Sequence, residues 1–100
     1  MMRVVDWSND AARDFDDAIE FITTESDVAA MLVANRILTA VDLLAEIPTG
    51  RRGRVGGTYE KPVQKTPYIV AYSLTNTSVT ILRIIHSARD WPQDQWPDDA

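Results

Sequence analysis

The stretch that decides the fold is residues 26–48, SDVAAMLVANRILTAVDLLAEIP. Apolar side chains recur in it at alternating steps of three and four residues, which is the spacing of one face of an α-helix. The residues of this seam are Ala30, Val33, Ile37, Ala40, Leu44 and Ile47. Pro48 and Gly50 follow, and both residue types end helices. The segment predicts a helix of about five turns, with Ile37 and Leu44 among its most buried residues.

The residues before this helix predict a strand and a second, antiparallel helix. Residues 3–7 (RVVDW) are rich in strand-forming types and stop at Ser8-Asn9-Asp10, a cluster of residues that cap helices. From there the apolar residues fall three or four apart, and acidic residues occupy the remaining arc. The apolar set is Ala11, Phe15, Ala18, Ile19 and Ile22. Residues 23–27 are a short polar connector, which favours a helical hairpin.

The residues after the long helix predict strands. Residues 51–54 (RRGR) form a basic loop with glycine at its centre. Strand-like runs follow at residues 54–61, with a bend at Gly56-Gly57, and at residues 68–73 and 79–86, with a turn at residues 75–77. The fold class we expect is α+β: an N-terminal strand, an antiparallel helical hairpin, and a three-stranded antiparallel meander packed on the hairpin. Residues 1–100 form one domain, with an acidic, proline-broken tail at 90–100.

Composition narrows the chemistry. The chain has no cysteine and one histidine, which excludes a disulfide framework and a thiolate metal site, so we expect no metal and no cofactor. We see no secretion signal and no apolar stretch of the ~20 residues that a bilayer requires. The expected location is the cytoplasm, without a membrane partner.

Charge is distributed unevenly along the chain, whose net charge is −5. Residues 1–47 carry three cations and ten acids, a net charge of −7, and residues 90–100 carry −4. Residues 48–89 reverse this with seven cations and Glu60 as the only acid, a net charge of +6. The asymmetry is either a chance fluctuation or a basic face for an acidic partner.

The order of elements and a set of short motifs resemble the RelE/ParE superfamily of toxins. The motifs are Ala29-Ala30, Leu44 through Pro48, Gly50-Arg51, Gly53-Arg54, Gly57-Thr58-x-Glu60, Pro67-Tyr68 with Tyr72, Ile81-Leu82-Arg83, and His86-x-x-Arg89-x-Trp91-Pro92. They span almost the whole chain. The resemblance implies the toxin of a type II toxin-antitoxin system, neutralised by a cognate antitoxin protein in a hetero-oligomer, which contacts DNA only through the antitoxin.

The superfamily has two activities on one scaffold, inhibition of DNA gyrase and ribosome-dependent cleavage of mRNA, and a fold does not decide between them. For a RelE-type nuclease the matching catalytic positions are Arg54, Arg83, His86 and Arg89. However, Asp90-Trp91-Pro92 follows Arg89 where related nucleases tend to have a tyrosine or a histidine-tyrosine pair, and neither tryptophan nor proline transfers a proton. His86, at the end of a buried strand, also fits a purely structural role.

Whether the chain is an enzyme therefore depends on its target. We prefer ParE-type inhibition of gyrase, because the arginines form a binding set without a proton donor and the acidic chain is disfavoured at ribosomal RNA. RelE-type cleavage of mRNA on the ribosome is the alternative, and an adaptor or an inactive toxin is a third. The residues expected to bind antitoxin or target are Arg51, Arg52, Arg54, Tyr59, Arg83, Arg89, Trp91 and Trp96.

Overall fold

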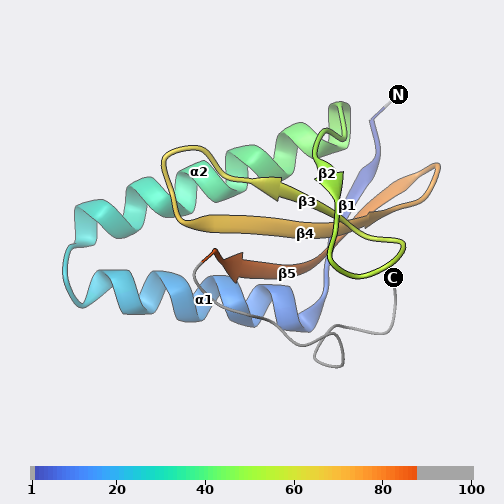
Figure 1. Cartoon of the computed structure of the whole chain (residues 1–100). Coiled ribbons are helices and arrows are strands. Elements are labelled where there is room, and N and C mark those ends of the chain that lie inside the picture. The colour runs from blue at the N-terminus through green and yellow to red at the C-terminus, as the bar shows by residue number, and fades with distance from the viewer. Residues whose placement is uncertain (1, 88–100) are drawn as a thin grey trace.

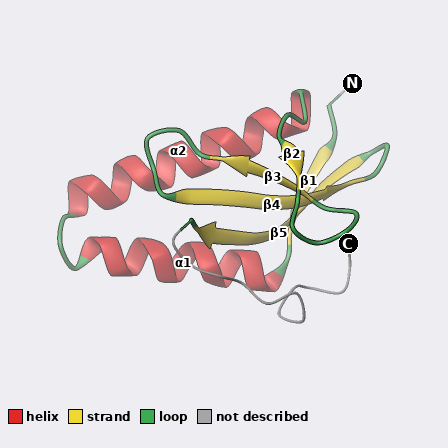
Figure 2. Cartoon of the chain, in the orientation of Figure 1, coloured by secondary structure: helices red, strands yellow, loops and turns green. Residues whose placement is uncertain are grey.

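A computed structural model describes residues 2–87 of the chain. Two helices and five strands follow one another in the order β1 (Val4–Trp7), α1 (Asn9–Thr23), α2 (Asp27–Glu46), β2 (Arg51–Arg52), β3 (Tyr59–Pro62), β4 (Tyr68–Leu74) and β5 (Ser78–His86). The helices form a hairpin that lies along β4 and β5 (Figures 1 and 2). The α+β class is confirmed, with a five-stranded mixed sheet against the hairpin. The predicted tail at 90–100 lies outside the described residues.

Both helices begin at a serine cap. The Oγ atom of Ser8 accepts a hydrogen bond from the backbone N–H of Ala11 at 3.0 Å, and that of Ser26 accepts one from Ala29 at 3.1 Å. Each bond satisfies an amide group that has no partner within its own helix. Ser8 also donates its hydroxyl hydrogen to the carbonyl of Leu82 at 2.9 Å. The start of α1 is therefore attached directly to β5.

The sheet has the strand order β1-β5-β4-β3-β2. The strands β2 to β5 are antiparallel to their neighbours in the chain, as a meander predicts, whereas β1 pairs in parallel with β5, with Val4 opposite Ser78. β5 therefore lies inside the sheet, which explains why its sequence is apolar on both faces.

Apolar side chains fill both faces of the sheet. The cluster between the sheet and the helices includes Ile37 and Leu44, which are 0% and 1% exposed as expected. A second cluster, made of Ile69, Ala71, Leu82 and Ile85 with Val55 packed against it, lies on the opposite face, which we call the distal face. Ile47 was wrongly included in the seam: it is the C-cap residue that follows α2, its backbone is extended, and it is 68% exposed.

The predicted strand at residues 54–61 is wrong in its first half. Arg51 and Arg52, expected in a loop, form β2 and pair with β3, while residues 53–58 form a loop. Gly57 has a φ angle of 82°, which a regular strand does not accept. The hydroxyl of Thr58 donates to the carbonyl of Val55 at 2.6 Å, which closes the loop.

The long helix also corrects an expectation about the membrane. Within residues 2–87, α2 is long and apolar enough to cross a bilayer by length and composition alone, with 20 residues. A core helix passes the same test, and Ile37, Val41 and Leu44 of α2 pack on the sheet.

Candidate functional site

A row of paired residues crosses the sheet where the basic segments meet. Arg51 of β2 pairs with Glu60 of β3, Glu60 with Ala71 of β4, and Ala71 with Arg83 of β5. Residues that pair directly across antiparallel strands point to the same face of a sheet. Ala71 belongs to the distal cluster, so Arg51 and Glu60 lie on the distal face.

Glu60 is the anchor of the basic loop. Its side chain is 3% exposed, and its Oε2 atom accepts hydrogen bonds from the backbone N–H of Arg54 at 2.8 Å and from the Nε of Arg54 at 2.9 Å. The Nη2 of Arg54 donates to Oε1 at 3.2 Å, and the Nη2 of Arg51 lies 3.8 Å from the same oxygen. One buried carboxylate therefore holds two arginines and fixes the path of the loop.

The ionisation of Glu60 follows from these contacts. Burial alone would raise the pKa of the Glu60 carboxyl, but the hydrogen bonds from Arg54 and the positive charges of Arg54 and Arg51 outweigh it. The pKa of Glu60 therefore lies below its ordinary value of 4.5. At neutral pH the group is a carboxylate that neutralises part of the surrounding charge.

Gly50 allows the chain to turn into β2, the strand at the end of this row. Its φ angle is 142°, and a Cβ atom at this position would lie 2.8 Å from the carbonyl oxygen of Glu60 and 2.9 Å from the hydroxyl of Tyr72. That hydroxyl donates to the carbonyl of Thr49 at 2.6 Å. Burial raises the pKa of Tyr72, with the neighbouring Tyr59 as a smaller cause, so the phenol remains a donor at neutral pH. A glycine is therefore needed where the chain turns into β2.

Arg83 turns away from the row toward α1. The register shifts between Ala71 and Tyr72, and such a bulge re-aims side chains. The Nε and Nη2 of Arg83 donate to the two carboxylate oxygens of Asp14 at 2.8 and 2.9 Å. Asp14 also accepts the backbone N–H of Ile84 at 3.1 Å. The hydrogen bonds with Asp14 raise the pKa of Arg83, against the effect of burial and with help from nearby negative charge.

The other expected residues do not join this row. Tyr59 pairs with Tyr72 and stacks on its ring at 5.6 Å, and Tyr72 belongs to the cluster beneath the helices. Arg52 pairs with Tyr59 and is exposed. His86 pairs with Tyr68, which belongs to the same cluster, and the two rings meet edge to face at 5.3 Å. The expected residues Arg89, Trp91 and Trp96 lie outside the described part of the chain.

The row can hold an anion but offers little for proton transfer. Arg51 presents an exposed guanidinium beside Arg54, which suits a carboxylate or a phosphate. His86 lies toward the face opposite Glu60, so the described part of the proposed catalytic set does not converge on one atom. Residues 2–87 also contain no group of three histidine, cysteine or acidic side chains that could bind a metal ion.

Sequence reasoning missed the two carboxylates that organise the site. Glu60 was noted as the only acid of a basic segment and as a motif residue but was given no role, although a lone acid between strand residues is a signal of a buried ion pair. Asp14 was assigned to the acidic arc of the first helix. It stands three residues after Ala11 and four before Ala18, both on the apolar stripe, so its spacing placed it at the sheet.

Comparison with known proteins gives a consistent picture. Residues 5–91 match the family model described as the ParE toxin of the type II toxin-antitoxin system parDE. Y4kP of Sinorhizobium fredii, which is named as a toxin, is 40% identical over 87% of this chain and 91% of its own length. The toxin RelE2 of Caulobacter vibrioides is 37% identical over 88% of this chain and 99% of its own length.

A solved structure shares the fold. A chain of the chromosomal ParDE system from P. aeruginosa superposes with a TM-score of 0.77, covering 85% of this chain and 96% of that one, at 21% sequence identity. At this identity the similarity concerns the fold. The two helices and the mixed sheet are therefore shared with a known toxin-antitoxin structure.

Proposed function

We propose that this chain, which belongs to the ParE toxin family of type II toxin-antitoxin systems, inhibits DNA gyrase by binding to it. The chain itself catalyses no reaction. A cognate antitoxin neutralises it in the cytoplasm. The alternative, cleavage of mRNA on the ribosome, requires a group that moves a proton beside arginines that hold the scissile phosphate.

One observation carries the choice: within residues 2–87, the two arginines that a nuclease would use, Arg54 and Arg83, have carboxylate partners in the fold. Arg54 is held by Glu60 and Arg83 by Asp14, each through two side-chain nitrogens. A phosphate would have to compete with these carboxylates for the same donors. His86 packs on Tyr68, toward the face of the sheet opposite Glu60 and Arg54. This arrangement favours a binding surface over a catalytic centre.

Charge supports the same choice. The chain has a net charge of −5, whereas a protein that enters a polyanion such as the ribosome gains affinity from neutralising phosphates. Arg51 and Arg52, both exposed in β2, are the cations that contact with gyrase would use. A protein target accepts this mixture of charges more readily than RNA does.

The test compares the two targets directly with the purified chain. We expect gyrase to lose supercoiling activity or to accumulate cleaved DNA, while mRNA on translating ribosomes stays intact. His86→Ala should change gyrase inhibition no more than it changes folding. The charge-reversing variant Arg51→Glu should weaken inhibition by about tenfold if the guanidinium contacts the enzyme.

The opposite result is equally clear. If mRNA is cut only when ribosomes are present, and Arg83→Ala stops the cutting while circular dichroism shows a folded chain, the gyrase proposal is overturned and the chain is a RelE-type nuclease. The pH dependence of cutting would then separate a histidine, near pH 6.5, from a tyrosine, near pH 10.

A further inference from the structure

Asp14 in α1 holds Arg83 in β5 through an ion pair that is largely buried. The Nε and Nη2 of Arg83 donate to the two carboxylate oxygens of Asp14, and the backbone N–H of Ile84 donates to one of them. The side chains of Arg83 and Asp14 are 11% and 13% exposed. If such a guanidinium loses its carboxylate, it keeps a charge that another anion can satisfy.

The fold fixes the position of this carboxylate. Asp14 lies three residues after Ala11, whose backbone N–H donates to the Oγ of Ser8 at 3.0 Å. The hydroxyl of Ser8 in turn donates to the carbonyl of Leu82 at 2.9 Å, and Leu82 is the residue before Arg83. The first turns of α1 are therefore attached to β5 beside the ion pair. A competing anion cannot move Asp14 aside without opening that attachment.

A cavity of about 680 Å³ lies beside this ion pair, between α1, the start of β4 and the end of β5. The rings of Phe21, Tyr68 and His86 line it, and aromatic rings of this kind stack on the unpaired bases of RNA. Asp14 and Asp17 also line the cavity, and none of its lining residues in the described part of the chain is lysine or arginine. The cavity therefore suits nucleobases but repels the phosphates that join them.

Asp14 screens Arg83 from this cavity. Among the described residues, Asp14 belongs to the lining of the cavity and Arg83 does not. Asp10, which lies one turn before Asp14 in α1, also acts on the Arg83 guanidinium through its negative charge. A phosphate in the cavity would therefore meet a carboxylate first, and it would reach the guanidinium only by displacing that carboxylate.

We propose that Asp14 is a specificity-determining residue, whose carboxylate occupies Arg83 and thereby keeps the phosphates of RNA out of the cavity beside α1. Specificity is a difference between affinities, and a like charge placed against the wrong partner is one way to obtain it. The inference rests on the proposed function, in which RNA is not the target. A purely structural ion pair would stabilise the fold in the same way, but its removal would create no affinity for RNA.

The experiment measures the binding of a short, fluorescently labelled single-stranded RNA to the purified chain by anisotropy. Asp14→Asn removes the charge with little change of shape and should lower the Kd for this RNA by at least about tenfold. Asp16→Asn is the matched control, because Asp16 is an exposed acid of the same helix and the change in net charge is identical. It should change the Kd by less than about twofold. Added salt should weaken the binding to Asp14→Asn steeply.

Two double variants separate the proposed contact from charge and from stability. Asp14→Asn with Arg83→Gln should return the Kd to within about twofold of the wild type, because the cation that binds phosphate is gone. Asp14→Asn with Lys65→Asn keeps the net charge at −5. Lys65 has a φ angle of 61°, which asparagine accepts more easily than lysine, so this variant regains some of the stability lost at Asp14. It should bind RNA as Asp14→Asn does, with circular dichroism showing a folded chain.

The outcomes separate this proposal from the gyrase proposal. If folded Asp14→Asn, alone or with Lys65→Asn, binds RNA no better than the wild type does, the ion pair is only structural and the specificity proposal is overturned. It is also overturned if the gain survives Arg83→Gln, since the gain then comes from the loss of an acid alone. A wild-type chain that leaves gyrase supercoiling unchanged would overturn the gyrase proposal, whatever the RNA measurements show.

Discussion

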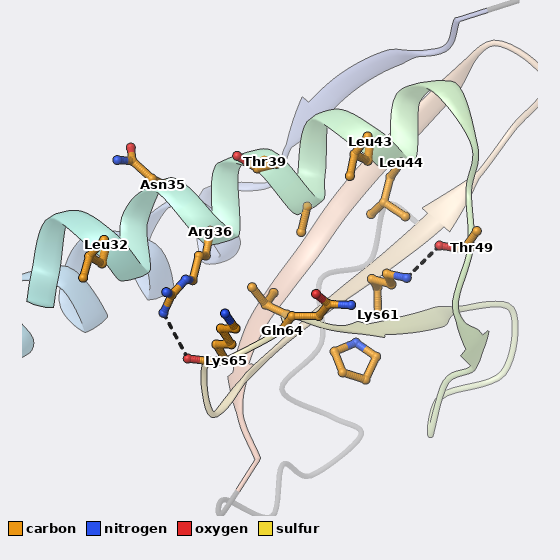
Figure 3. Close-up of a pocket in the computed structure, with 13 residues that line it drawn as sticks. Leu32, Asn35, Arg36, Thr39, Leu43, Leu44, Thr49, Lys61, Gln64 and Lys65 are labelled. Carbon is orange, nitrogen blue, oxygen red and sulfur yellow. Dashed lines mark hydrogen bonds between the residues drawn. The ribbon is translucent and has the colours of Figure 1, made fainter.

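The surroundings of Arg54 and Arg83 provide counter-charges for these cations, whereas the groove between α2 and β3, which is lined by Arg36, Lys61 and Lys65, provides none among residues 2–87 (Figure 3). Arg54 and Arg83 each donate two side-chain hydrogen bonds to a carboxylate of the same chain. In the groove, Arg36 and Lys61 donate to neutral oxygens. The first arrangement holds elements of the fold together, and the second leaves charge for another molecule.

This difference in internal ion pairs indicates which basic residues are available to bind a ligand. A count of arginines along the chain emphasises residues 51–54 and 83, because several lie close together there. The ion pairs in the structure lead to the opposite conclusion. A guanidinium that already contacts a buried carboxylate loses that partner when it binds a ligand. The less clustered cations Arg36 and Lys65 are therefore the better candidates for recognition.

The largest expected effect comes from breaking an internal pair. Asp14→Ala removes three hydrogen bonds at once and leaves the largely buried guanidinium of Arg83 without its carboxylate, since the two side chains are 13% and 11% exposed. We expect the free energy of unfolding to fall by about 3 kcal/mol, measured by urea denaturation.

Two controls make this prediction specific. Asp16→Ala removes an exposed acid from the same helix, and Arg36→Ala removes a groove cation. Each should change the free energy of unfolding by less than about 0.5 kcal/mol. Equal losses for Asp14 and Asp16 would mean that Asp14 is an ordinary surface charge, and the contrast between paired arginines and groove cations would disappear.

The second prediction concerns pH and Glu60. Because the pKa of Glu60 is lowered by folding, the carboxylate stabilises the fold above its ordinary pKa of 4.5, and this contribution is lost as the pH falls through the lowered value. Glu60→Gln should reduce the free energy of unfolding by about 1–2 kcal/mol at neutral pH. The difference between wild type and variant should narrow as the pH falls below 4.5.

Denaturation curves over this pH range provide the check. If the free energies of unfolding of the wild type and of Glu60→Gln change in parallel down to acid pH, the ionisation of Glu60 does not stabilise the loop. Glu25→Gln, which replaces an exposed acid between the helices, serves as the control and should leave the profile of the wild type nearly unchanged.

The smallest expected effect is a gain in stability. Lys65→Asn places a residue that tolerates positive φ at a position with φ of 61°, and should stabilise the fold by about 0.5–1 kcal/mol. Gln64→Asn, one residue earlier, is the control and should leave the free energy of unfolding nearly unchanged. A loss of stability in Lys65→Asn would contradict the strain inferred from the φ angle of Lys65.

The sequence predicted those parts of the fold that depend on local periodicity. The steps of three and four in residues 26–48 identified Ile37 and Leu44 as core residues, and serine caps begin both helices. Parallel pairing of β1 with β5 could not be inferred, because it joins residues 74 positions apart and leaves no local pattern. The strand split at residues 53–58 depends on the side chain of Glu60, which periodicity does not describe.

The candidate site was predicted by residue type but not by arrangement. The clustering of arginines in the sequence identified Arg51, Arg54 and Arg83 as site residues. The face of the sheet on which each side chain lies depends on the fold. Tyr59 lies one residue before Glu60, yet alternation along the strand directs it to the opposite face. The groove escaped notice for a related reason: Arg36 lies in a strongly acidic half of the chain, and only tertiary packing brings it next to Lys65.

The neighbouring position of β1 and β5 has a consequence for how the protein is made. The strand synthesised first, Val4–Trp7, finds its partner only after residues 78–81 have been translated. Because chains grow at about 5–20 residues per second, β1 waits for about 4–15 seconds with its hydrogen-bonding groups unpaired by β5. The hairpin of α1 and α2 can form earlier, since its contacts are local. A nascent chain halted before β5 thus lacks the strand that joins β1 to the rest of the sheet, and so the toxin reaches its complete form only late in its own translation.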